Sequence, residues 1–239
     1  MRILIIRHGD PDYEKDSLTE KGWHEAELLA DKMAKLDVKA FYVSPLGRAQ
    51  DTAGVTLKKI NRTAKTYHWL REFNAPIYEH GKHCGPWDLL PSFYTNQDDF
   101  YNIQKWGDTK FMKKGGVKSE YDKVCKNFDK ILRNHGYERH DKYYKVNSAN
   151  TDTIVFFCHF GVECVLLSHL LNISPVSLWQ GFCAAPSSVT SLYSEEREKG
   201  IAVFRCNAFG DTSHLYAGNE EPAFAARFCE TFDDETQRH

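Results

Sequence analysis

The stretch Ile3-Leu4-Ile5-Ile6-Arg7-His8-Gly9 decides the fold of this chain. Its apolar run is typical of a strand that is buried on both faces of a parallel sheet. The run stops at an arginine, a histidine and a glycine. In open α/β sheets, ligands bind beyond the carboxyl ends of the strands, and Gly9 would let the backbone approach a ligand closely. The alternative is that Arg7 and His8 only cap a strand at the surface.

Length and composition favour one folded domain. The chain has 239 residues, of which 41% are hydrophobic, so it has enough apolar side chains for a sizeable core. Its formal net charge of -2 does not indicate binding to nucleic acid or to a membrane surface. We therefore expect a single domain over residues 1–239, with an insertion at residues 74–150.

Targeting and metal-binding signals are weak. The apolar run at Ile3 is too short for a signal peptide, and no stretch approaches the roughly 18 apolar residues of a membrane span. The seven cysteines are scattered without a CxxC pair, which favours reduced thiols and a cytoplasmic location. His80, His83 and Cys84 cluster, but they lack a second ligand pair, so we expect a surface loop there rather than a metal site.

The segment after Gly9 predicts a loop, a helix and a second strand. Thr19 is a plausible N-cap for a helix that extends to about Leu36. The residues Val38 to Val43 form the next expected strand. Ser44-Pro45 ends it, and a new helix begins near Leu46 with Arg48 in its first turn. Helix N-termini favour negative charge, so Arg48 suits an anion shared with the helix; a solvated arginine is the alternative.

A third strand is predicted over Ala64 to Leu70, where the pattern alternates. It is followed by Arg71 and Glu72, so another charged pair stands at a strand end. The alternative is an Arg–Glu ion pair on the surface, which would contribute little to stability.

Residues 74–150 break the pattern with prolines, glycines and many aromatic side chains. A bare loop of this length is uncommon in a compact domain. We expect short helices, then one long helix from about Lys118 to Asn134, then a flexible polar connection from His135 to Asn150. The aromatic residues indicate either a lid over a site or a satellite core, and we favour the core.

Thr153 to Cys158 is the second strongly apolar run and predicts another buried strand. It ends in His159-Phe160-Gly161, before a helix from Val162 to Leu171. A histidine and a glycine therefore recur at a strand-to-helix junction, where helix N–H groups favour an anion. The stretches Val189–Tyr193 and Ile201–Cys206 predict a closing antiparallel pair. The acidic tail past Gly218 is expected to fray.

The ends of these elements carry five residues that suit phosphate chemistry. They are Arg7, His8, Arg48, Glu72 and His159. Arginine guanidinium groups match phosphate oxygens in pairs of hydrogen bonds. A neutral histidine is a nucleophile toward phosphorus, and a carboxylic acid protonates a leaving alcohol. We therefore expect the elements to gather at one edge of the sheet around a phosphoryl group.

These motifs resemble the histidine phosphatase superfamily, which includes phosphoglycerate mutases and broad phosphatases. The resemblance rests on Arg7-His8-Gly9, the segment Ser44–Ala53, Glu72 and the segment Cys158–Gly161. It implies a phosphoglycerate mutase-like α/β fold: a mostly parallel sheet with helices on both faces and a largely helical insertion.

The resemblance also implies roles for the residues. His8 would become phosphorylated, Arg7, Arg48 and His159 would hold the phosphoryl group, and Glu72 would be the proton donor. Gly9 and Ser17 are further candidates for the substrate pocket, although Ser17 is better suited to help cap the next helix. No metal or other cofactor is expected, because the arginines supply positive charge. The partner would be a small phosphorylated molecule, and the oligomeric state cannot be read from the sequence.

The loop after Gly9 favours a phosphatase over a mutase. Asp10 and Asp12 would repel a second phosphate group, and the insertion has no evident arginine pair for a bisphosphate. The expected function is metal-independent hydrolysis of phosphate monoesters through a phosphohistidine at His8. The alternatives are a phosphoglycerate mutase-like isomerase and a non-catalytic binder of phosphorylated ligands.

Overall fold

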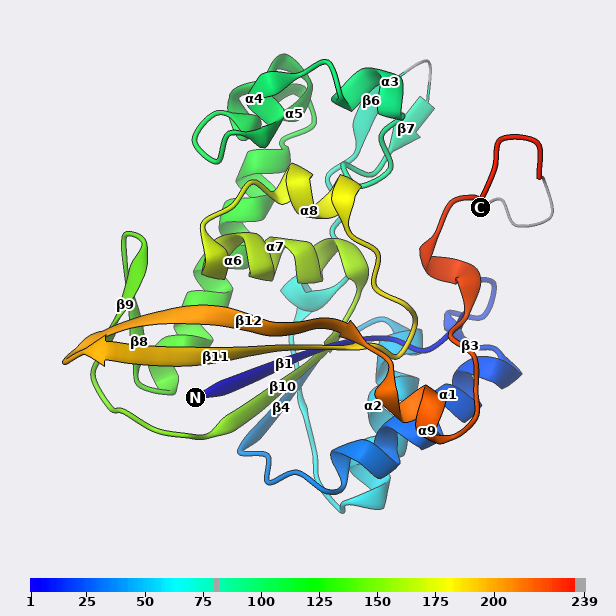
Figure 1. Ribbon diagram of the computed structural model, residues 1–239, viewed down its shortest axis with the longest axis vertical. Coiled ribbons are helices and arrows are strands. Elements are labelled where there is room, and N and C mark those ends of the chain that lie inside the picture. The colour runs from blue at the N-terminus through cyan, green and yellow to red at the C-terminus, as the bar shows by residue number, and fades with distance from the viewer. Residues whose placement is uncertain (80–81, 235–239) are drawn as a thin grey trace.

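The computed structural model describes residues 1–79 and 82–234. Its centre is an eight-stranded sheet with the order β5-β4-β10-β1-β11-β12-β9-β8 (Figure 1). The strands are β1 (Arg2–Arg7), β4 (Ala40–Val43), β5 (Lys65–Thr66), β8 (Tyr137–His140), β9 (Tyr143–Val146), β10 (Thr153–Cys158), β11 (Val189–Glu198) and β12 (Ile201–Asp211). The pairs among β5, β4, β10 and β1 are parallel, and the remaining pairs are antiparallel.

Helices cover both faces of the sheet (Figure 1). One layer contains α1 (Glu20–Met33), α2 (Gly47–Lys59) and α9 (Ser213–Ala217); the other contains α6 (Val117–Asn134), α7 (Phe160–Leu171) and α8 (Pro175–Gly181). Each layer has its own apolar core against the sheet. The predicted α/β class, with helices on both faces and a largely helical insertion, is confirmed.

The two apolar runs of the sequence form adjacent strands at the centre of the sheet. Successive residues of β1 and β10 point to opposite faces, so Ile3 and Ile5 enter one core while Leu4 and Ile6 enter the other. All four side chains are fully buried, which explains why the run lacks polar alternation. The parallel register pairs Arg7 with Cys158, so both strands end together.

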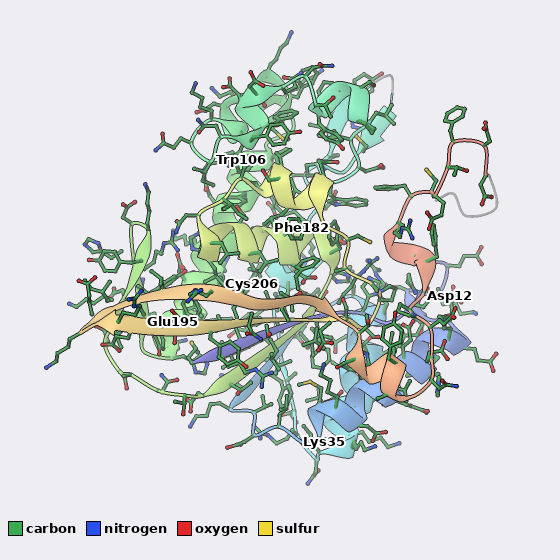
Figure 2. All side chains as sticks on the ribbon, viewed as in Figure 1. Asp12, Lys35, Trp106, Phe182, Glu195 and Cys206 are labelled. Atoms are coloured by element: carbon green, nitrogen blue, oxygen red, sulfur yellow. The ribbon has the colours of Figure 1, made fainter. Side chains whose placement is uncertain are left out.

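The insertion stands above α7 and α8 (Figure 1). It contains the hairpin β6 (Ile77–Glu79) and β7 (Lys82–Cys84), then α3 (Pro91–Tyr94), α4 (Asp98–Tyr101) and α5 (Lys110–Lys114), before α6. Trp106 lies at its base (Figure 2) and packs against Trp179 of α8 with 6.0 Å between the ring centroids. Most aromatic residues of the insertion therefore join the core of this layer, as expected, whereas Tyr78 and Tyr101 are exposed.

Two expectations from the sequence are wrong. The strand predicted over residues 64–70 shrinks to β5, followed by the 3₁₀ turn η1 (His68–Leu70), because Tyr67 and Trp69 pack on the helical layer instead of alternating. The polar stretch 135–150 is a hairpin, β8–β9, that extends the sheet. Tyr137 and Tyr144 are buried there, so its tyrosines supply core contacts.

Three other expectations have mixed outcomes. Thr19 caps α1 as predicted, since its side chain accepts a hydrogen bond from the backbone N–H of Gly22. Cys84 lies in the β6–β7 hairpin, whereas a surface loop was expected; His80 lies outside the described residues. The tail is held at Glu220, which pairs with Lys21, before it forms the turn η3 (Phe224–Ala226), whereas Phe228 and Phe232 further along are exposed.

No helix in the described part of the chain is long and apolar enough to cross a membrane.

Candidate active site

The ends of β1 and β10 bring two histidines together. His8 and His159 directly follow strands that end in register, and the backbone N–H of His8 donates to the carbonyl of Cys158 (3.1 Å). Their ring centroids lie 5.1 Å apart with the planes tilted by 57°. Both side chains are buried. The convergence expected from the sequence is therefore present.

His8 is held as a neutral imidazole with a defined tautomer. Arg48 Nε donates to His8 Nε2 (3.3 Å). Because an arginine only donates, Nε2 must carry the lone pair, and Nδ1 carries the proton that it donates to the carbonyl of Gly9 (2.7 Å). Burial and then the charge of Arg7 lower the pKa of His8 well below its usual value. Nε2 is therefore a free-base nitrogen at neutral pH.

Ser44 orients the second histidine. It stands at the end of β4, where its backbone N–H donates to the carbonyl of Phe157 (2.9 Å). Its hydroxyl oxygen accepts from Leu46 N–H (3.2 Å) and lies 2.7 Å from His159 Nε2. His159 Nδ1 is buried without a partner among the described residues. If the Ser44 hydroxyl donates to Nε2, Nδ1 carries the proton and is left to donate to a ligand.

Burial and the neighbouring positive charges keep His159 neutral as well. Burial is the main cause that lowers its pKa well below the usual value, followed by His8, Arg48 and Arg7. Two neutral rings lie beside two guanidinium groups, so the pocket offers positive charge while its nucleophile stays unprotonated. That combination suits an anionic electrophile.

Arg7 is a buried side chain anchored by backbone carbonyls. Its Nη1 donates to Ala184 (2.6 Å), in the loop before β11, and its Nη2 to Ala225 (3.5 Å), in the C-terminal tail. A guanidinium has five N–H donors, so these two bonds fix its plane and leave others for a ligand. The tail thereby contributes to the site.

Arg48 lies in the first turn of α2, as predicted, and an anion does share that helix end. The anion is the carboxylate of Asp16, which accepts from Arg48 Nη1 (2.6 Å) and from the backbone N–H of Gly47 (2.7 Å). Asp16 has a positive φ of 48°, a conformation that aspartate tolerates better than most residues. The carboxylate therefore occupies donors that a phosphoryl oxygen would use. The sequence analysis missed it.

Glu72 follows the turn η1 and reaches the N-terminus of α7. Its Oε1 accepts from the backbone N–H groups of Phe73 (2.7 Å) and Val162 (3.3 Å). Burial raises the pKa of Glu72, while these two N–H groups, Arg7 and Arg48 lower it in part. Glu72 is therefore a buried carboxyl that favours protonation and lies within electrostatic reach of both arginines.

A second buried carboxyl, which the sequence analysis also missed, lies one turn into α7. Glu163 follows His159 by one helical turn and is almost completely buried. Burial raises its pKa to about 7, with Thr190 and Arg7 opposing the shift. It adds negative charge beneath Arg7 and His159 when it ionises.

Two further candidates have other contacts. Gly9 is needed because a Cβ there would lie 2.7 Å from the carbonyl oxygen of Gly22, so the close approach is to α1. Its N–H donates to Thr52 (2.9 Å). The Ser17 hydroxyl donates to Asp51 (2.6 Å) on α2. A substrate-binding role for Ser17 stays a prediction without a supporting contact.

Within residues 1–79 and 82–234, no group of three or more histidine, cysteine or acidic side chains is arranged to hold a metal. A cavity of about 480 Å³ lies elsewhere, along the outer side of α6, and none of the five predicted catalytic residues lines it. The chemistry-bearing groups instead converge at the carboxyl ends of β1, β4 and β10.

Comparison with known proteins places this geometry in a family. Residues 3–207 match the family model of the histidine phosphatase superfamily, branch 1. A 2,3-bisphosphoglycerate-dependent phosphoglycerate mutase from Thermoplasma acidophilum is 36% identical over 73 residues, and the serine/threonine-protein phosphatase Pgam5 from Caenorhabditis briggsae is 36% identical over 98 residues. These matches cover 26% and 39% of this chain, but only 36% and 35% of those proteins.

Solved structures share the fold at low identity. A phosphoserine phosphatase from Entamoeba histolytica superposes with a TM-score of 0.61 at 17% identity, covering 90% of this chain and 98% of that one. A mycobacterial glucosyl-3-phosphoglycerate phosphatase, solved with VO3, gives 0.57 at 17% identity, covering 87% and 98%.

Proposed function

This chain belongs to the histidine phosphatase superfamily, and on that premise we propose that it hydrolyses phosphate monoesters through a phosphohistidine at His8. The observation that carries the proposal is the unprotonated Nε2 of His8, whose lone pair accepts a hydrogen bond from Arg48 in a pocket with Arg7 and His159. A nucleophile, three groups suited to hold an anion and a protonated carboxyl are the parts that this reaction needs.

Substrate binding would use the donors that the pocket leaves available. Arg7 and Arg48 would bind the non-bridging phosphoryl oxygens, and His159 Nδ1–H would donate to one of them. Asp16 would leave Arg48 and Gly47 N–H as the dianion arrives. The guanidinium groups supply positive charge of the kind that magnesium supplies in other phosphoryl-transfer enzymes.

In the first half-reaction, Arg48 Nε would release His8 Nε2 for a phosphoryl oxygen, and the freed lone pair of Nε2 would attack phosphorus in line with the leaving oxygen. The N–P bond forms as the P–O bond breaks, and the Glu72 proton passes to the departing alkoxide. The carbonyl of Gly9 accepts from Nδ1–H and stabilises the positive charge that develops on the ring. The products are a phosphohistidine, a free alcohol and the Glu72 carboxylate.

In the second half-reaction, the same carboxylate would take a proton from water as the water oxygen attacks phosphorus. The N–P bond breaks, the electron pair returns to Nε2, and inorganic phosphate leaves. Glu72 ends protonated, ready for the next cycle. A carboxyl with a raised pKa serves both as acid and as base near neutral pH.

The acidic loop favours hydrolysis over a mutase cycle. Asp10 accepts a hydrogen bond from the Thr19 hydroxyl (2.7 Å). Asp12 forms an ion pair with Lys15 (2.7 Å), and Asp16 forms one with Arg48. Three carboxylates in the loop that follows Gly9, one of them on Arg48, would disfavour the second phosphate of a bisphosphate. We infer a substrate that is a small molecule with one phosphate ester.

Product analysis tests this proposal. The purified protein should release inorganic phosphate from monoesters and should not interconvert 2- and 3-phosphoglycerate beyond what the release accounts for. Isomerisation in excess of phosphate release would favour the mutase. Phosphate binding without any turnover would favour a binding protein.

A further inference from the structure

The indole of Trp87 is a polar group that the proposed reaction does not yet use. Trp87 lies in a turn of the insertion that the backbone N–H of Asp88 closes onto the carbonyl of Gly85 (3.0 Å). Gln180, from α8, donates to the carbonyl of Pro86 (2.8 Å). These two contacts hold the backbone on either side of Trp87.

Trp87 Nε1 is buried and has no hydrogen-bond partner among the described residues. An indole nitrogen only donates. A buried donor without an acceptor destabilises the folded state, and such groups in native proteins call for an explanation. An acceptor that changes during the reaction supplies one.

The carboxyl of Glu72 lies across Gly161 from this indole. A Cβ on Gly161 would lie 2.6 Å from Glu72 Oε1, 2.8 Å from Trp87 Cδ1 and 2.9 Å from Trp87 Nε1. The carboxyl and the indole N–H therefore share one small space above the first turn of α7. A glycine at position 161 is what leaves that space open.

We propose that Trp87 is a positioning residue, whose indole N–H is held to bind the Glu72 carboxylate that forms when the leaving group takes its proton. In the resting state, Phe73 and Val162 both donate to Oε1. When Glu72 loses its proton, the carboxylate gains a full negative charge shared by its oxygens, and Oε1, which lies across Gly161 from the indole, becomes a stronger acceptor. Trp87 then donates a hydrogen bond and keeps its own proton, so no other bond changes.

The inference rests on the proposed role of Glu72 as the acid. Other charged and titratable groups face this carboxyl and also influence any measurement made against pH. They are Arg7 on β1, Arg48 on α2, and Glu163, Cys158 and Cys164 on β10 and α7. Asp88, beside Trp87, also titrates, because burial raises its pKa. A test must therefore separate Glu72 from these neighbours.

Indole NMR of the resting protein makes that separation. The chain has five tryptophans, and Trp87→Phe identifies the Trp87 ¹H–¹⁵N signal. We expect this signal to move downfield as Glu72 ionises and to stay still in Glu72→Gln, while it keeps moving in Asp88→Asn. Trp69, which packs against Phe128 and Phe156, serves as the reference. If the chemical shift of the Trp87 signal does not change with pH in the wild type, the inference is overturned, whether or not the protein is a phosphatase.

Kinetics supply a second readout. An N–H donor favours the charged carboxylate. With an alkyl phosphate as substrate, Trp87→Phe should therefore raise the apparent pKa of the Glu72 limb in the pH–rate profile by about one unit. If activity falls while the apparent pKa of this limb stays unchanged, Trp87 has only a packing role, and the inference is overturned. A Trp87 signal that responds to inorganic phosphate but not to Glu72 ionisation does the same, because the donor then serves the ligand.

Discussion

The imidazole rings of His8 and His159 lie 5.1 Å apart, although 150 residues separate them in the chain. Parallel pairing of β1 with β10 produces this contact, since the strands end together. Two neutral rings, flanked by Arg7 and Arg48, form the core of the candidate site.

His8→Ala should lower phosphate release from any monoester by at least about 10³-fold, because the nucleophile is lost. His24→Ala, a change at an exposed histidine on α1, is the matched control and should leave turnover near that of the wild type. Steady-state phosphate release measures both variants. Residual turnover of the His8 variant within tenfold of wild type would assign the nucleophile elsewhere.

A chelator should leave the wild-type rate unchanged.

Glu72→Gln should slow alkyl phosphates by about 10²–10⁴-fold and activated aryl phosphates far less, because only poor leaving groups need a proton. Comparing kcat/KM for the two substrate classes measures the difference. Asp88→Asn is the comparison variant, since Asp88 is a neighbouring carboxyl with a raised pKa. If the leaving-group dependence appears in the Asp88 variant instead, the acid role moves there.

Ser44→Ala should lower kcat/KM by about tenfold, because His159 Nε2 loses its hydroxyl partner and the ring loses its fixed tautomer. The ¹⁵N shifts of His159 should report a mixed tautomer in the variant and one tautomer in the wild type. An unchanged tautomer with lower activity would mean that Ser44 supports the strand end alone.

Asp16→Asn should tighten the binding of inorganic phosphate several-fold, since the resting carboxylate competes for Arg48 and for the N–H of Gly47. The inhibition constant of phosphate measures this, with Asp12→Asn as the control in the same loop. Weaker phosphate binding in the Asp16 variant would show that this carboxylate orients Arg48 for the ligand.

Glu163→Gln should make the free energy of unfolding of the protein less dependent on pH. Burial raises the folded pKa of Glu163 to about 7, above its unfolded value, so ionisation favours the unfolded state as pH rises through that window. The stabilisation is present below about pH 4.5 and is lost by about pH 7. In urea unfolding, the free energy of unfolding of the variant should rise by about 3 kcal/mol relative to that of the wild type between pH 4.5 and pH 8. An equal pH dependence in both proteins would contradict this, and exposed Glu27→Gln is the control.

Much of this site is readable in the sequence because strand ends of a parallel sheet meet at one edge. Arg7, His8 and His159 each adjoin an unbroken apolar run, so the pattern alone places them together. Arg48 is readable for a different reason, since a cation in a first helical turn indicates an anion. Glu72 joins these four residues from the turn η1 and not from the strand end that the pattern predicted.

The remaining groups depend on contacts that no local pattern reveals. Asp16 reaches Arg48 through a left-handed backbone, and Ser44 meets His159 only because β4 pairs with β10. Trp87 reads as one more aromatic residue of the insertion. The β8–β9 hairpin was missed because buried tyrosines in a polar stretch do not resemble a core strand.

Trapping the phosphorylated enzyme tests the central claim most directly. Glu72→Gln, which should accumulate the intermediate, is mixed with an aryl phosphate, quenched in alkali and digested for mass spectrometry. We predict a phosphoryl group on His8 that survives alkali and is lost in acid. Phosphate release without any adduct on His8, or an adduct on another side chain, would contradict the account.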